Sequence, residues 1–111
     1  MGYTIIYYDE AVQETVLSLP TTLRARYFNL TDRMEIHGAN LGEPHTLALG
    51  EGLFELRLKG AEGIARVFYC TLVEHRIVML HGFVKKSQKT PLRERRLAET
   101  RMKEIKYADT R

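Results

Sequence analysis

The segments Phe54-Glu-Leu-Arg-Leu-Lys59, Gly60-Ala-Glu-Gly63 and Ile64-Ala-Arg-Val-Phe-Tyr69 together predict a β-hairpin. Apolar and polar residues alternate strictly in the first segment, as is typical of a strand with one buried face. The glycine-flanked segment predicts the turn, and this turn pairs Lys59 with Ile64. One face of the hairpin is then wholly apolar. A slip of one residue would mix apolar and polar side chains on that face, so the register is well specified.

This register places Arg57 directly opposite Arg66, and Glu55 opposite Phe68. Like charges directly across a strand pair destabilise a sheet. Either an anion lies between the guanidinium groups, or each arginine side chain turns away or pairs with an acid such as Glu55 or Glu62. We favour the anion, because the planar fork of arginine matches the geometry of a phosphate group.

A turn at Glu74-His75 and a third strand over Arg76–Val84 extend the same face. This pairing puts Phe68 beside His81 and Arg66 beside Phe83, with Lys85 just beyond the strand. A carboxylate, a histidine and cations on one surface suit metal-free RNA cleavage, in which a base deprotonates the 2′-OH and an acid protonates the leaving oxygen. The candidate catalytic residues are Glu55, Arg57, Arg66, His81 and Lys85. The candidate RNA-binding residues are Lys59, Lys86, Lys89, Arg93 and Arg96.

Outside this unit the sequence predicts one more strand and three helices. The expected elements are a strand over Tyr3–Tyr8, a helix over Glu10–Leu19 capped by Asp9, a helix capped by Thr21 or Thr22 that ends at Gly38, a loop over 39–52, and a basic helix over Leu92–Lys106 that follows Thr90-Pro91. The apolar stripes of the first two helices are expected to be core, and they consist of Val12, Val16 and Leu19, then Leu23, Tyr27, Leu30 and Met34. The fold class is therefore α+β. An N-terminal helix hairpin and a C-terminal helix are expected to pack around a small, twisted, mainly antiparallel four-stranded sheet.

The chain has 111 residues, 44% of them hydrophobic and 28% charged, which indicates one globular domain over 1–111. No apolar run is long enough for a membrane span, no secretion signal is evident, and the single cysteine fits the cytoplasm. Neither a metal site nor a cofactor is expected. The net charge is +3, but residues 1–52 carry three basic and seven acidic residues, and residues 53–106 carry thirteen and six. This asymmetry indicates an anionic partner on one face.

Four segments resemble the phage-derived, HigB-like branch of the RelE/ParE toxin superfamily. They are Gly52-Leu-Phe-Glu-Leu-Arg-Leu-Lys59, Ala65-Arg-Val-Phe-Tyr69, Val78-Met-Leu-His-Gly-Phe-Val-Lys-Lys86 and Gln88-Lys-Thr-Pro91. The resemblance extends from Tyr3 to Tyr107. It implies a RelE-like fold and the toxin of a type II toxin–antitoxin pair, which cleaves mRNA on the ribosome without metal. The implied partners are mRNA, ribosomal RNA and a helix-turn-helix antitoxin.

The resemblance also implies roles for single residues. Arg66 matches an arginine that contacts the scissile phosphate, and Arg57 matches a basic residue on the preceding strand. Glu55 lies where some members have a general-base glutamate and others a lysine. Lys85 or Lys86 lies near the basic residue that follows the last strand. The segment Ser87-Gln88-Lys89-Thr90 departs from the family, because several members have a tyrosine or histidine there. The leaving-group acid is therefore open among His81, Lys85 and Lys86. The superfamily also includes gyrase poisons, and a non-catalytic phage-derived binding protein is a further alternative.

Overall fold

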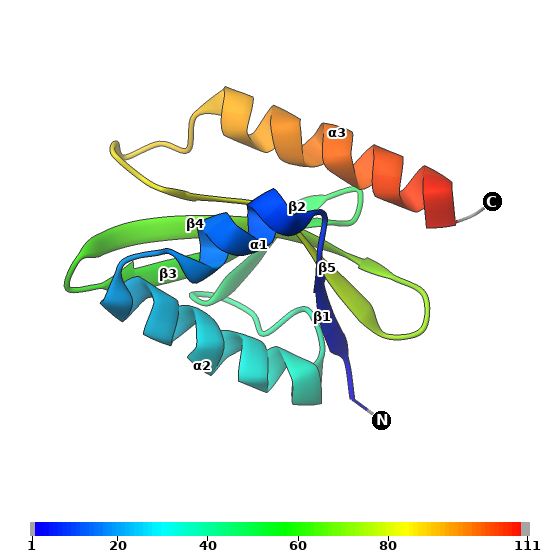
Figure 1. Cartoon of the computed structure of the whole chain (residues 1–111), viewed down its shortest axis with the longest axis horizontal. Coiled ribbons are helices and arrows are strands. Elements are labelled where there is room, and N and C mark those ends of the chain that lie inside the picture. The colour runs from blue at the N-terminus through cyan, green and yellow to red at the C-terminus, as the bar shows by residue number, and fades with distance from the viewer. Residues whose placement is uncertain (1, 110–111) are drawn as a thin grey trace.

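Five strands form one sheet in the computed structural model, which describes residues 2–109 (Figure 1). The order across the sheet is β1-β5-β4-β3-β2, and only β1, which runs parallel to β5, departs from antiparallel pairing. The strands are β1 (Thr4–Tyr7), β2 (Thr46–Gly50), β3 (Leu53–Gly60), β4 (Gly63–Leu72) and β5 (Arg76–Val84). The α+β class is confirmed, but the expectation of four strands is wrong.

The additional strand is β2, which lies within the segment 39–52 predicted to be a loop. Four glycine and proline residues in that segment obscured the strand in the sequence. β2 forms because its backbone pairs with β3, with Thr46 opposite Leu56 and a bulge between Ala48 and Gly50. β2 therefore depends on pairing with β3 more than on alternation of apolar and polar residues in its own sequence.

The register of the β3–β4 hairpin is confirmed. Arg57 lies opposite Arg66, and Lys59 opposite Ile64. The predicted two-residue turn between β4 and β5 is wrong, because Leu72 is the last residue of β4 to pair and the turn contains three residues.

Two residues of the β4–β5 turn, Glu74 and His75, have φ angles of 64° and 57°. The longer turn shifts the register by one residue at this end of the hairpin. A bulge at Leu80 reverses the shift, so that Phe68 still lies opposite His81 as expected. The predicted pairing is therefore correct beside the arginine pair and wrong at the turn.

Helices α1 (Glu10–Leu17) and α2 (Thr21–His37) cover one face of the sheet (Figure 1). α1 packs mainly on β5 and α2 mainly on β3, so the two helices contact the sheet more than each other. The expected helix hairpin is therefore a pair of helices laid on neighbouring parts of the sheet. Its apolar stripes are buried as predicted, at Val12, Val16, Leu19, Leu23, Tyr27, Leu30 and Met34.

The two helices begin differently. The Asp9 carboxylate accepts a hydrogen bond from the Val12 N–H at 2.8 Å, which confirms the predicted cap of α1. The predicted threonine cap of α2 is wrong, because Pro20 occupies the capping position. The carboxylate of Glu62, in the β3–β4 turn, instead accepts from the Thr22 N–H at 2.7 Å and the Thr22 hydroxyl at 3.1 Å.

Helix α3 (Leu92–Asp109) covers the opposite face and packs on β4 and β5. Ala98 and Met102 are buried in a second apolar cluster with Phe68 and Cys70. The sheet is thus enclosed between α1 and α2 on one side and α3 on the other. On the sheet face that α3 covers, the region near Arg57 and Arg66 carries polar side chains. Among residues 2–109, no helix has the length and apolar character needed to cross a membrane.

Candidate functional site

The candidate site centres on three charged side chains from β3 and β4. Strand alternation turns Glu55 and Arg57 to the same face, and pairing places Arg66 beside them. Glu55 Oε1 lies 3.2 Å from Arg57 Nε and 3.7 Å from Arg66 Nε. The acid predicted as one alternative therefore does lie between the like charges. One carboxylate against two guanidinium groups still leaves an excess of positive charge.

Arg66 is the more buried of the two arginines, with its side chain 11% exposed against 35% for Arg57. Burial lowers the pKa of Arg66, the Arg57 charge lowers it further, and Glu55 opposes both effects. Arg66 Nη1 donates to the Ala65 carbonyl at 3.1 Å. Among the described residues, Arg66 Nε is the buried side-chain nitrogen that has no hydrogen-bond acceptor. Since such a donor is costly to leave unsatisfied, it favours the arrival of an anion.

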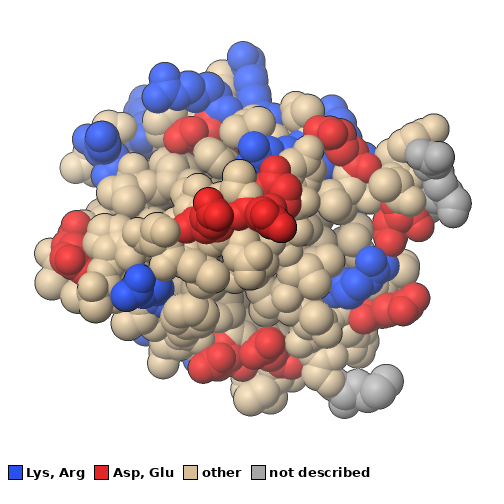
Figure 2. Space-filling view, in the orientation of Figure 1, with Lys and Arg blue, Asp and Glu red and all other residues tan. Residues whose placement is uncertain are grey.

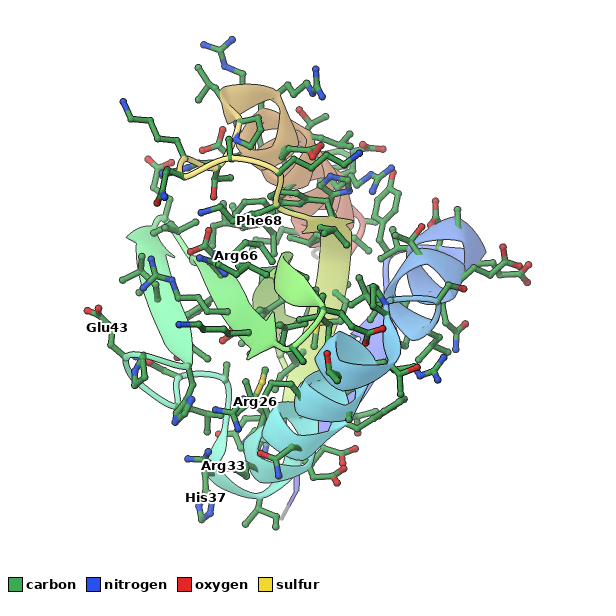
Figure 3. The ribbon with its side chains drawn as sticks, turned by 90° about the vertical axis from the view of Figure 1, so that its left-hand side faces the viewer. Arg26, Arg33, His37, Glu43, Arg66 and Phe68 are labelled. Atoms are coloured by element: carbon green, nitrogen blue, oxygen red, sulfur yellow. The ribbon has the colours of Figure 1, made fainter. Side chains whose placement is uncertain are left out.

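A pocket of about 580 Å³ opens beside Arg57 and Arg66. Four of its eight lining residues are cationic, and none is acidic. The lining residues are Arg26, Pro44, His45, Arg57, Leu58, Lys59, Ile64 and Arg66. In Figure 3 the labelled side chains Arg66, Arg26 and Arg33 follow one another down this side of the molecule. The pocket is therefore electropositive and suits a polyanion.

Lys85 lies at the other border of the site. Its backbone N–H donates to the Ile64 carbonyl at 2.7 Å, which holds it beside the hairpin, and its ammonium donates to the Gln88 carbonyl at 2.7 Å. Burial lowers the pKa of Lys85, as do the charges of Arg66 and Arg57, while Glu55 raises it. Lys85 therefore lies within the electrostatic reach of all three central side chains.

His81 is held by a different set of contacts. Its Nε2 lies 3.0 Å from Glu94 Oε1, at the start of α3, and its ring stacks on Phe83. It does not line the pocket beside Arg57 and Arg66. The expected convergence on one site therefore includes Glu55, Arg57, Arg66 and Lys85, while His81 joins α3 to β5.

The proposed RNA-binding residues form two groups. Lys59 lines the pocket beside the arginine pair. Four exposed residues, Lys86, Lys89, Arg93 and Arg96, lie in the loop before α3 and in its first turns. Figure 2 shows lysine and arginine gathered over this end of α3, whereas acidic residues lie over α1. The asymmetry of charge along the sequence thus corresponds to an asymmetry of charge on the surface of the molecule.

Two pocket residues were not singled out from the sequence, Arg26 and His45. Arg26 belongs to a helix whose apolar stripe drew attention to packing, and His45 belongs to the segment expected to be a loop. The backbone N–H of Arg57 donates to the His45 carbonyl at 2.9 Å, which places His45 beside Arg57. Since β2 was not predicted, no pattern in the sequence around Arg26 or His45 links them to the site.

Cys70 and clustered metal-binding side chains are two other features that could supply chemistry. Burial raises the pKa of the Cys70 thiol to about 11, so this cysteine is a poor nucleophile at neutral pH. Among residues 2–109, no group of three or more histidine, cysteine, aspartate or glutamate side chains is arranged to hold a metal ion. The chemistry available at the arginine pair is electrostatic stabilisation and proton transfer.

Comparison with known proteins identifies a family and a fold. A family model described as phage-derived protein Gp49-like matches residues 14–103. Among solved structures, a chain in the crystal structure of the archaeal RelE-RelB complex from Pyrococcus horikoshii OT3 is similar, with a TM-score of 0.56 and 20% identity. The alignment covers 78% of this chain and 98% of that chain. The search of curated proteins gave no match.

Proposed function

Because the chain belongs to the phage-derived Gp49-like family, a family of RelE/HigB-type toxins, we propose that it is an endoribonuclease that cleaves mRNA on the ribosome. The observation that carries this proposal is the buried, unsatisfied Nε–H of Arg66 beside an electropositive pocket. A phosphodiester would supply the missing acceptor. Arg57 would bind the same group, since its side chain lies beside Arg66 and is more exposed.

In the proposed reaction the RNA supplies its own nucleophile. The incoming phosphate competes with Glu55 for the two guanidinium groups and weakens the contacts that hold the carboxylate. Glu55 then accepts the proton of the ribose 2′-OH, and the 2′-oxygen attacks phosphorus. Arg57 and Arg66 stabilise the negative charge that develops on the phosphorane. The bond to the 5′-oxygen breaks, which leaves a 2′,3′-cyclic phosphate.

The leaving 5′-oxygen must gain a proton. Lys85 is the proposed donor, because its charge interacts with those of Arg66, Glu55 and Arg57 and its lowered pKa makes it a better acid than an ordinary lysine. His81 is less suited, because Glu94 engages its Nε2. The chemistry requires no metal and would take place in the cytoplasm, where translating ribosomes present mRNA.

An antitoxin is the proposed protein partner. The similar archaeal RelE was solved together with RelB. We infer that this chain likewise binds an antitoxin, with a helix-turn-helix protein as the expected type. A gene for such a protein beside the gene for this chain would support the inference, and its co-expression should suppress toxicity.

Inducible expression with mapping of mRNA 5′ ends tests the proposed reaction. The wild-type chain should arrest growth and produce new 5′ ends within translated regions. Arg66→Ala should lower cleavage by roughly 10²–10³-fold, because one preorganised phosphate donor is lost. Arg76→Ala is the matched control, since Arg76 is also a strand arginine but pairs with Asp109. Equal cleavage by Arg66→Ala and wild type would contradict the proposal. A DNA-damage response with intact mRNA would instead support the gyrase-poison alternative.

A further inference from the structure

Beyond Arg57, the electropositive pocket continues to a pair of side chains from two other elements. Arg26 comes from α2 and His45 from the residue before β2. Arg26 Nη2 lies 3.1 Å from His45 Nδ1. Arg26 and His45 both line the pocket that also contains Arg57 and Arg66. Neither residue belongs to the β3–β4 hairpin.

The hydrogen bond determines which nitrogen of His45 carries a proton. Arginine has only donors, so His45 Nδ1 must accept. A ring whose Nδ1 accepts is in its neutral form, and burial and the charges of Arg33 and Arg26 favour this form because they lower the pKa of His45. The single ring proton is then on Nε2. His45 therefore offers a neutral N–H donor next to the Arg26 cation.

Arg26 carries a charge that no carboxylate balances within the described residues. Its contacts are with His45 and, at 3.5 Å, with the side-chain oxygen of Asn29, both of which are neutral. By contrast, Glu55 partly balances Arg57 and Arg66. A cation without a counter-charge at a pocket that has no acidic lining is a favourable place for an anion.

The sheet sets the spacing between this pair and the central arginines. His45, which directly precedes β2, forms a row across the sheet with Arg57 on β3 and Arg66 on β4. Neighbouring strands lie about 4.8 Å apart, so the row extends roughly 10 Å. A row of this length exceeds the distance between neighbouring phosphates of one extended RNA strand, so a polynucleotide over the row presents more than one phosphate to it.

We propose that Arg26 and His45 form a second phosphate subsite, which binds the phosphodiester next to the one held by Arg57 and Arg66. This inference rests on the proposed function and extends it, because it defines the path of the RNA strand away from the cleaved bond. Arg26 supplies charge, and the His45 Nε2–H supplies a directed hydrogen bond. The subsite touches the substrate without taking part in bond breaking.

Short 2′-O-methyl RNAs, which cannot be cleaved by 2′-OH attack, provide the test. A dinucleotide without terminal phosphates has one phosphodiester, and the corresponding trinucleotide has two. Binding of each to the purified full-length chain is measured by NMR titration at several salt concentrations. The wild-type chain should bind the trinucleotide more tightly and with a steeper salt dependence, by about 0.7 in log–log slope for the extra phosphate.

Arg26→Gln is the decisive variant, because it removes the charge and keeps a polar side chain that is compatible with a helix. It should weaken trinucleotide binding roughly tenfold, as expected for one charged hydrogen bond, and leave dinucleotide binding unchanged. Its salt slope with the trinucleotide should fall to that measured with the dinucleotide. His45→Asn, which keeps an acceptor for Arg26 but lacks the Nε2–H, should weaken only the trinucleotide. Arg24→Gln, on the same helix but outside the pocket, is the matched control.

Negative results for Arg26→Gln and for Arg66→Ala contradict different proposals. The subsite is refuted if Arg26→Gln binds the trinucleotide like the wild type, or if it weakens both probes equally with unchanged salt slopes. The second result would assign Arg26 a purely structural role in holding the loop. Arg66→Ala should weaken both probes, and its failure to do so would contradict the proposed function while leaving the test of Arg26 valid. Thermal unfolding of each variant confirms that the comparison is made between folded proteins.

Discussion

At the scale of single residues, the central finding is that Glu55 lies between Arg57 and Arg66. The opposition of the two arginines was predictable, because strict alternation and a glycine-flanked turn leave one sensible register. The position of the Glu55 carboxylate was not predictable, because the direction of a side chain depends on neighbours, here from other strands and from the loop before α3. The Thr90 hydroxyl, for example, lies 3.5 Å from the other Glu55 oxygen.

The proposed role of Lys85 has a consequence for the pH dependence of cleavage. The acid form is the ammonium ion, so the cleavage rate should fall as pH rises through the lowered pKa of Lys85. In Lys85→Arg the side chain stays protonated, because the pKa of a guanidinium group lies far above that of an ammonium group. Single-turnover cleavage on ribosomes should then be about 10²-fold slower, because a guanidinium ion is a poor acid, and the alkaline decline should disappear.

The neighbouring lysine provides the control for this prediction. Lys86→Arg should keep both the rate and the alkaline decline, since Lys86 is exposed. An unchanged decline in Lys85→Arg would show that another group titrates, and it would remove Lys85 from the reaction as the acid.

At the scale of elements, prediction succeeded where the signal is local and failed where it is not. The buried stripes of α1 and α2 follow from spacing in the sequence, and the Asp9 cap follows from one side chain at a helix start. β2 and the start of α2 depend on contacts with distant residues. The strand needs β3 as its partner, and the helix needs Glu62 from the β3–β4 turn.

The contact between Glu62 and Thr22 gives a prediction about stability. Glu62 accepts two hydrogen bonds from Thr22, and the Glu62 N–H donates to the Thr22 hydroxyl at 3.2 Å. Glu62→Ala should therefore lower the free energy of unfolding by about 1 kcal/mol, as expected for loss of a helix cap. Urea unfolding followed by circular dichroism measures this change.

A neighbouring pair of threonines provides a matched comparison for the same contact. Thr22→Ala should also destabilise the protein, whereas Thr21→Ala, at an exposed position, should have little effect. Equal effects of the two threonine substitutions would show that helix propensity, and not the contact with Glu62, accounts for the loss.

At the scale of the whole molecule, the charge asymmetry of the sequence becomes a basic end of the structure (Figure 2). The four exposed cations Lys86, Lys89, Arg93 and Arg96 surround the start of α3. Their distance from the apolar core means that they affect binding more than folding. We expect them to contact ribosomal RNA, while the pocket beside Arg66 takes the mRNA.

This division of roles predicts how binding to the ribosome responds to salt. Replacing all four cations with glutamine should weaken association and flatten its dependence on salt concentration, because fewer counterions are released. The unfolding temperature should change little, since surface substitutions of this kind usually have small effects on stability. A salt dependence equal to that of the wild type, measured by ribosome co-sedimentation, would rule out this role for the basic end.

The parallel pairing of β1 with β5 determines when the sheet can be completed during synthesis. Residues Thr4–Tyr7 leave the ribosome well before their partners Arg76–Met79, because β2, β3 and β4 lie between the two strands in the chain. Helix α3, which follows β5, also contacts this region, since Arg101 lies over the Tyr8 ring at 4.9 Å. The sheet of the nascent chain therefore lacks β1 as a paired strand until β5 has emerged. A ribosome making this protein is thus exposed to the completed sheet only after both β5 and α3 have been made.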